Sequence, residues 1–386
     1  MQQSDSEKIP FWRNSRVIKI LGQGVVLALV ITILVLLGSN LVNNLQRLNL
    51  NFGFNFLDRA ASFAIADPPI DYSPTDPYFR ALFVGLLNSL RVMFFGIIMA
   101  AILGIMVGIG RLSDNWLVRK LASAYVEVLR NTPLLLQLFF WYFAVFLRLP
   151  KIERPLIVGD RFFLTNRGLD IPWFVLDLRT ILTFVAIAGC VLLGEAAWRK
   201  RNQAVEQGQN PQLWLVMVGT SAIATLLVFC FGIDWIIPQL ENQSITGGLN
   251  LSPEFATLLI GLGIYTSAFI AEVVRAGIQS VSQGQWEAAK ALGLRPANIM
   301  QLVIFPQALR VMIPPLTSEF LNLIKNSSLA IAIGYSDIYA IGNTIFNQTG
   351  KPIEIILMLM LVYLTINLIV SLIMNRFNAA VQLKER

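Results

Sequence analysis

The chain has 386 residues, of which 55% are hydrophobic and 14% are charged, whereas a soluble domain carries about 25% charged residues. This composition indicates a polytopic membrane protein and excludes an ordinary soluble domain. The net charge of +7 does not indicate nucleic-acid binding, because the basic residues cluster beside apolar runs, as the cytoplasmic flanks of membrane spans do.

Several kinds of chemistry are excluded by the residue types. The sequence has no His, so neither His-based acid–base catalysis nor a His metal site is possible. Its two cysteines, Cys190 and Cys230, each lie in an apolar run without the spacing of a disulfide framework or a metal site. No GxxxxGK[ST] motif for the phosphates of ATP is present. We therefore expect no catalytic residue, metal or cofactor in this chain.

Apolar runs predict eight membrane spans, since a spanning helix needs about 20 apolar residues. A polar, basic tail at 1–20 comes first, and it lacks the features of a cleaved signal peptide. In chain order the predicted spans are 24–41, 87–109, 122–147, 181–197, 213–231, 255–274, 311–333 and 353–374.

The short basic loops predict the orientation of these spans. With eight spans, the N-terminal tail, 111–120, 199–201, the connector after the sixth span and the C-terminus all fall on one side. That side is cytoplasmic by the positive-inside rule, so both termini are expected inside. One outside loop, 148–179, disagrees, because it contains Lys151, Arg154, Arg161 and Arg167. We interpret it as a small ordered insertion.

The connector after the sixth span includes the sequence EAAKALGLRPANIMQLVIFP at 287–306. Its first six residues are good helix formers, and Gly293 then provides a left-handed stop. Pro296 suits the first turn of a second short helix, and Pro306 is predicted to end it. Small residues at Ala288 and Ala289 would let the first helix approach another protein closely.

This pattern resembles the coupling loop of the permeases of ABC importers. Glu-Ala-Ala is followed after three residues by Gly and after nine more by Val303-x-Phe305-Pro306. The resemblance implies that the loop docks in a groove of a separate ATPase, which holds ATP and magnesium. The coupling residues would be Glu287, Ala288, Ala289, Gly293 and Pro306. An ordinary helix–Gly–helix connector is the alternative.

A second EAA sequence begins at Glu195, but it does not share the rest of this pattern. Arg201 stands where a turn-forming Gly would be required. We exclude this sequence as a coupling element.

Polar residues interrupt the third predicted span. They are Arg130, Asn131, Thr132 and Gln137, and Pro133 breaks the helix ahead of it. A charge costs at least about 2.5–3.5 kcal/mol in the middle of a membrane, so Arg130 must face other helices, a cavity or the interface. The segment resembles the family's R-G-T-P sequence, with Asn131 in place of Gly. Both substrate contact and a structural counter-ion role remain open.

The end of the sixth span reads YTSAFIAEVVRAGI, which resembles the sequence of amino-acid permeases. Ser267 is a candidate pathway residue, although it also allows close helix packing. Glu272 and Arg275 are three residues apart, which favours a local ion pair. Gly277 is predicted to end the helix.

The seventh span contains a third polar group, and its sequence resembles the family's L-x-K-[DN]-[TS]-S-L. A cation, an amide and two hydroxyls can bind the carboxylate and ammonium ends of an amino acid. We favour pathway lining over inter-helix hydrogen bonding for Lys325, Asn326, Ser327 and Ser328.

Together these resemblances imply an all-α integral membrane protein with the five-helix core of type I ABC importer permeases and extra spans. The expected divisions are a cytoplasmic tail at 1–20, an extra first span and outside loop at 21–79, core helices one and two at 80–148, an insertion with two extra spans at 149–254, and core helices three to five at 255–386. The last division would include the coupling loop, 280–310.

By the same resemblance, the chain would be the permease subunit of a bacterial inner-membrane importer of L-amino acids, and not an enzyme. Its partners would be a second permease subunit, identical or homologous, two ATPase subunits and an extracytoplasmic amino-acid-binding protein. An ion-coupled secondary amino-acid transporter is the alternative function. A purely structural membrane scaffold would not need the polar residues in the third and seventh spans.

Overall fold

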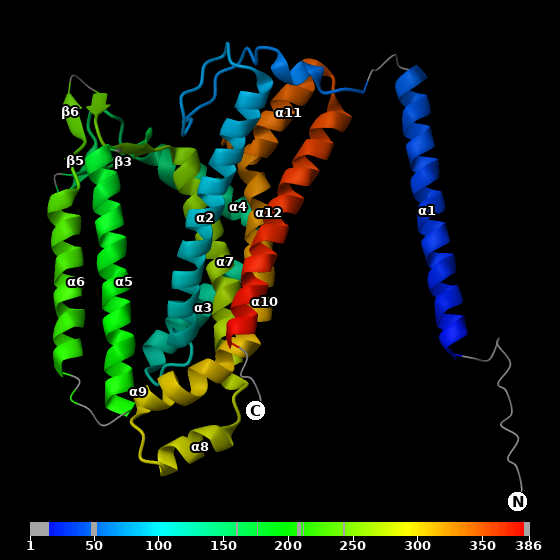
Figure 1. Ribbon diagram of the computed structural model, residues 1–386. Coiled ribbons are helices and arrows are strands. Elements are labelled where there is room, and N and C mark those ends of the chain that lie inside the picture. The colour runs from blue at the N-terminus through cyan, green and yellow to red at the C-terminus, as the bar shows by residue number, and fades with distance from the viewer. Residues whose placement is uncertain are drawn as a thin grey trace, which may run out of the picture.

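A computed structural model describes residues 15–47, 52–159, 161–175, 177–206, 210, 212–241 and 244–381. Most of the predicted cytoplasmic tail at 1–20 lies outside these residues, as do the basic C-terminal residues Lys384 and Arg386. The helices of the described residues are α1 (Ser15–Arg47), α2 (Tyr78–Gly110), α3 (Trp116–Arg130), α4 (Leu134–Phe139), α5 (Leu178–Glu206), α6 (Gln212–Gly232), α7 (Pro253–Gln279), α8 (Gln283–Ala291), α9 (Pro296–Asn298), α10 (Phe305–Asn326), α11 (Ile338–Thr349) and α12 (Pro352–Val381) (Figure 1).

Among the described residues, seven helices are long and apolar enough to cross a membrane, or eight if a bent pair counts as one span. The bent pair replaces the predicted continuous span at 122–147. Its two arms, Trp116–Arg130 and Leu134–Arg148, meet at 104°. The bend lies where Pro133 was predicted to break the helix, because Pro has no N–H to donate and its ring clashes with the preceding turn.

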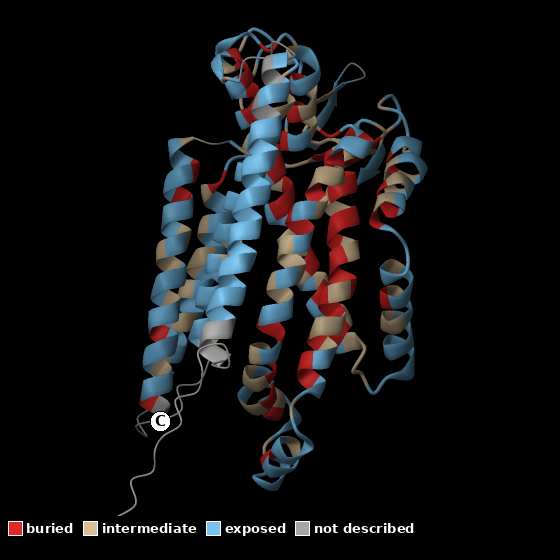
Figure 2. Ribbon diagram, turned by 90° about the vertical axis from the view of Figure 1, so that its right-hand side faces the viewer, coloured by how far each residue is buried: buried red, intermediate tan, exposed pale blue. Residues whose placement is uncertain are grey.

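The centre of the fold is the contact between α2 and α7. A Cβ atom on Gly104 would lie 2.5 Å from the Cγ2 atom of Ile270, and one on Gly108 would lie 2.7 Å from the Cβ atom of Val274. Only glycine lets the two backbones come this close. Figure 2 shows that buried residues are concentrated in some helices while others are almost entirely exposed. The most apolar window of α7 is 61% buried, whereas that of α6 is 0% buried.

Gly277 does not end the sixth span, contrary to the prediction. Helix α7 continues to Gln279, and a Cβ atom on Gly277 would lie 2.3 Å from the Cγ atom of Met312 in α10. The residue is therefore a packing position between two helices. The helix continues past Gly277 because packing between the helices outweighs the low helix propensity of one glycine.

The segment at 149–254, expected to be an insertion, contains short strands that the sequence analysis did not predict. β1 (Leu156–Val158), β2 (Phe162–Thr165), β3 (Gly168–Ile171) and β8 (Leu249–Leu251) form one antiparallel sheet in that order. β4 (Trp173–Phe174) pairs with β5 (Trp235–Ile236), and β6 (Gln239–Glu241) pairs with β7 (Ser244–Thr246). The described residues of the 148–179 loop thus contain strands, in keeping with its interpretation as a small ordered insertion, while the chain remains mostly helical.

This sheet connects the α5–α6 hairpin to the rest of the protein. Strand β3 precedes the hairpin and β8 follows it, so their pairing closes the insertion next to the start of α7. The Asn250 amide donates a 2.7 Å hydrogen bond to Asp170 across the two strands. Burial raises the pKa of Asp170, although this hydrogen bond partly opposes the rise.

The segment between α1 and α2 covers the end of the bundle at which the strands lie (Figure 1). It contains a 3₁₀ turn, Asn55–Asp58, and is held by two contacts that are distant in sequence. Gly53 donates its N–H to the buried Glu354 carboxylate at 3.0 Å, and Arg91 in α2 pairs with Asp67 at 2.8 Å. At the opposite end lie α8, the end of α5, the start of α6, the start of α1 and the end of α12 (Figure 1).

Candidate coupling segment and polar pathway residues

The connector after α7 forms a short exposed helix, α8, that ends in a left-handed turn. Gly293 has φ +71°, as predicted from its position. Its N–H binds the Lys290 carbonyl at 2.9 Å, and the N–H of Leu294 binds the Ala289 carbonyl at 3.3 Å. These two bonds define a Schellman motif, which satisfies the carbonyls at a helix end. The sequence therefore encodes a defined turn here.

One face of α8 packs on the protein and the other is free. Ala289 is 3% exposed and belongs to the main core cluster, together with Ile299 and Ile304. Glu287 and Ala288 are exposed, and Leu292 is 80% exposed. The residues of the expected coupling segment thus divide between the core and the exposed surface of the protein.

Pro306 does not end the second helix of the connector, contrary to the prediction. Pro296 begins α9 as expected, but the chain continues through a π-helical turn, Ile299–Ile304, directly into α10. Pro306 lies in the first turn of α10. A wider π turn ahead of the proline accommodates the carbonyl that loses its usual N–H partner. The second helix is therefore the start of a longer one.

The polar residues of the third span lie around the 104° bend. Gln137 is buried, and its amide donates to the Leu129 carbonyl at 2.9 Å and to the Thr132 hydroxyl at 2.7 Å. The Thr132 hydroxyl donates to the Val128 carbonyl at 2.9 Å. These bonds satisfy backbone carbonyls that the break leaves free, as a membrane segment requires.

Arg130 and Asn131 are exposed at the same bend. The Arg130 guanidinium lies 5.1 Å from the centre of the Phe269 ring in α7, which is a cation–π contact. Asn131 caps α3, and its N–H binds the Glu127 carbonyl at 3.2 Å. Substrate contact by either residue stays a prediction.

Ser267 lies between helices. It is 0% exposed and its hydroxyl is 2.6 Å from the Tyr125 hydroxyl of α3. It also donates to the Ile264 carbonyl at 2.7 Å. These contacts give Ser267 a role in packing α7 against α3, and its place in a substrate pathway remains a prediction.

The seventh span divides its polar residues between two environments. Lys325 and Ser328 line a cavity of about 460 Å³ between α10, α11 and α12. Ser327 is 1% exposed and its hydroxyl donates to the Ile324 carbonyl at 2.8 Å. Neither it nor Asn326 belongs to the lining of this cavity, and none of the residues around the 104° bend does.

Three polar residues of this cavity were missed by the sequence analysis. Tyr339 comes from α11, and Tyr363 and Asn367 come from α12. Asn367 donates to the Tyr363 carbonyl at 2.7 Å, while its own carbonyl oxygen is buried without a hydrogen-bond partner in the described part of the chain. An amide within the strongly apolar eighth span was the signal that could have identified this residue.

Glu272 forms the predicted pair with Arg275 and a second pair with Arg111, the residue that directly follows α2. All three side chains are partly buried. By contrast, the excluded Glu195 forms an exposed i,i+4 pair with Arg199 within α5. Glu272 therefore joins two helices electrostatically, near the end of the bundle from which α8 projects.

Residues 93–383 match the family model described as "Binding-protein-dependent transport system inner membrane component". The chain belongs to this family. It is therefore a multi-pass inner-membrane component of an ABC transport system that also has an ATPase and a binding protein, and in such systems ATP hydrolysis takes place in the separate ATPase subunit.

Three curated relatives are similar over almost their whole length. A putative amino-acid ABC transporter permease, YhdX of Escherichia coli K12, is 46% identical over 90% of both chains. The general L-amino acid transport system permease AapQ of Rhizobium johnstonii is 43% identical over 92% of both chains. The glutamate/glutamine/aspartate/asparagine permease BztB of Rhodobacter capsulatus is 42% identical over 94% of this chain and 93% of its own. The similarity thus extends well beyond the half of the chain that carries the recognised motifs.

We expect Glu272→Gln to destabilise the protein, because Arg111 and Arg275 would lose a charged acceptor in a partly buried site. The loss should be about 1.5–3 kcal/mol, the range for hydrogen bonds to charged groups. Thermal unfolding of the purified protein in detergent measures it. The matched control is Glu195→Gln, which removes an exposed pair and should cost less than about 1 kcal/mol. Equal melting temperatures for the two variants would contradict a structural role for Glu272.

Proposed function

We propose that this protein is the permease subunit of an ABC importer for L-amino acids. The observation that carries the proposal is the similarity to AapQ, a general L-amino acid permease, over 92% of both chains. The names of YhdX and BztB also refer to amino-acid transport. The cavity at Lys325 adds chemical support, since an ammonium group near hydroxyl and amide groups suits a carboxylate ligand.

An ion-coupled secondary transporter would need neither a binding protein nor an ATPase, so membership of the binding-protein-dependent family favours the importer. The local geometry agrees. Such a transporter uses free intramembrane acids, and the acid of the sixth span, Glu272, is not free because it is held by two arginines.

The proposed assembly pairs this chain with a second permease subunit, either homologous or identical, and with two ATPase subunits. An extracytoplasmic binding protein delivers the amino acid. Closure of the ATPase dimer on ATP displaces α8, and the core helices of 80–148 and 255–386 switch from inward-open to outward-open. The first span and the 149–254 insertion are additions to this core.

Reconstitution of the whole complex in proteoliposomes tests the function. We expect ATP turnover to rise when the binding protein is loaded with an L-amino acid, and the labelled amino acid to accumulate inside. A panel of acidic, amide, basic and apolar amino acids, with a sugar as control, defines the substrate range. Uptake driven by an ion gradient in the absence of ATP would contradict the proposal.

If Lys325 binds the substrate carboxylate, Lys325→Gln should weaken transport. Loss of a charge-assisted hydrogen bond predicts an uptake rate about 10-fold to 100-fold lower at subsaturating substrate. Uptake is measured per assembled complex, so that assembly defects do not count. Lys19→Gln, on α1, is the control and should leave uptake unchanged. Normal uptake in Lys325→Gln would assign this residue to packing.

We propose that both termini, α8 and the α5–α6 connection face the cytoplasm. After replacement of Cys190 and Cys230 by serine, single cysteines at Ser244 in β7 and Gln203 in α5 provide the test, because both positions are exposed. A membrane-impermeant maleimide added to intact cells should label only the first. Labelling of the second from outside would overturn the eight-span arrangement.

The coupling role of α8 predicts a specific effect of Gly293→Val. The space around Gly293 is open, so the substitution strains the left-handed turn by roughly 1–2 kcal/mol without a clash. The protein should remain in the membrane but retain less ATPase, or lose the stimulation of ATP turnover by loaded binding protein. Glu287→Ala should show a milder form of this defect. Co-purified ATPase and ATP turnover are the two measurements.

Gly350→Val is the matched control, because Gly350 also has a positive φ and open space but ends α11 at the other end of the bundle. It should carry the same strain and leave ATPase retention normal. Glu195→Ala should also be silent. Equal defects in Gly293→Val and Gly350→Val would mean that strain in general, rather than coupling, explains the result.

A further inference from the structure

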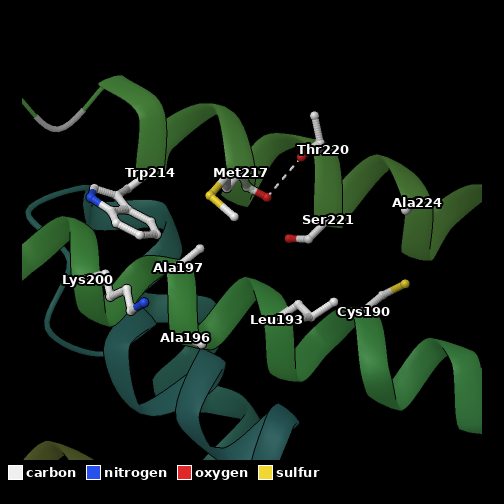
Figure 3. A pocket seen from close by; sticks show the side chains of 10 residues that line it. All are labelled: Cys190, Leu193, Ala196, Ala197, Lys200, Trp214, Met217, Thr220, Ser221 and Ala224. Atoms are coloured by element: carbon white, nitrogen blue, oxygen red, sulfur yellow. Dashed lines mark hydrogen bonds between the residues drawn. The ribbon is translucent and has the colours of Figure 1, made fainter.

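A groove of about 410 Å³ runs between α5 and α6, away from the cavity and coupling segment described above. Figure 3 shows the side chains that line it, five from each helix. Most of the wall is apolar or small, as with Leu193, Ala196 and Ala224. The two helices pack on each other, and the insertion meets the core bundle through its sheet, so this hairpin presents much of its surface to the membrane.

The two hydroxyls of the groove are already used by their own helix. Thr220 donates to the Met217 carbonyl at 3.1 Å (Figure 3), and Ser221 donates to the Val218 carbonyl at 2.8 Å. A polar ligand would therefore gain little along this wall. An apolar chain suits it.

One end of the groove is cationic. The Lys200 ammonium lies 5.0 Å from the centre of the Trp214 ring, so that a charge from α5 and an aromatic ring from α6 meet there (Figure 3). Arg199 and Arg201 flank Lys200 in the sequence, and Arg199 is paired with Glu195. Within the described side chains, no carboxylate forms an ion pair with Lys200. A Lys beside a Trp at a helix end is typical of the membrane interface.

The cationic end lies at the same end of the protein as α8 (Figure 1), which the proposed orientation assigns to the cytoplasm. The cytoplasmic leaflet contains anionic lipids, and basic pockets between membrane helices on that side bind their headgroups. The groove thus has an apolar length for an acyl chain and a cation at the level of lipid phosphates.

We propose that the groove between α5 and α6 is a binding site for one anionic phospholipid of the cytoplasmic leaflet. An acyl chain lies along Leu193, Ala196 and Met217, and the phosphate binds Lys200. The proposal rests on the proposed orientation for its leaflet, but it is independent of the transported substrate.

The test uses the full-length protein, purified in detergent, delipidated and titrated with dioleoyl phosphatidylglycerol or dioleoyl phosphatidylcholine. Native mass spectrometry counts the bound lipid. We expect one phosphatidylglycerol to bind more tightly than phosphatidylcholine. Lys200→Gln should weaken phosphatidylglycerol binding about fivefold, the effect of one basic residue near an anionic surface, and leave phosphatidylcholine unchanged. Lys200→Arg should restore the preference.

Two further variants distinguish binding of the acyl chain in the groove from binding of the phosphate by Lys200. Ala196→Leu fills the groove without changing charge, so it should weaken both lipids. Lys120→Gln removes an exposed lysine of α3 and should bind like the unmodified protein. Equal binding by Lys200→Gln and Lys120→Gln would overturn the site, and so would displacement of the lipid by inorganic phosphate. Because binding is measured without transport, such a failure would leave the import function untouched, while a failed import assay would leave the lipid measurement valid.

Discussion

The close approach of α2 and α7 is the constraint on which the rest of the structure depends. Lipid offers no hydrophobic driving force between helices, so the two are held by backbone-level packing at Gly104 and Gly108. Helix α7 also packs against α3 at Ala268 and Ala271, and against α10 at Gly277. One helix therefore positions both the bent third span and the helix that continues from the connector.

Several polar side chains within the bundle bind other polar groups of the protein, because water is absent there. The side-chain amide of Gln137 donates hydrogen bonds to the broken third span, and the Glu272 carboxylate pairs with two arginines. Lys325 differs from these, because it faces a cavity and forms no ion pair within the described residues. A side chain that packing does not use is the better candidate for contact with a transported molecule.

Local chemistry made parts of this structure predictable. The left-handed turn at Gly293, the break at Pro133 and the pair of Glu272 with Arg275 each depend on residues close together in sequence. The errors involved distant partners. Gly277 continues its helix because Met312 packs against it, and Asn367 faces a cavity made by three helices. The strands, two to four residues long, were too short to produce a periodic pattern.

The wrong prediction at Pro306 has the largest mechanical consequence. Since the connector does not stop there, a single helical run extends from Pro296 to Ile333. At one end, Gln307 donates to Gln285 of α8 at 3.1 Å, and Ala289 packs in the same core cluster as Ile299. At the other end, the run contains Lys325 and Ser328 of the cavity. A force on α8 must therefore either break these contacts or move the run itself, so the proposed coupling needs no chain of separate intermediate contacts.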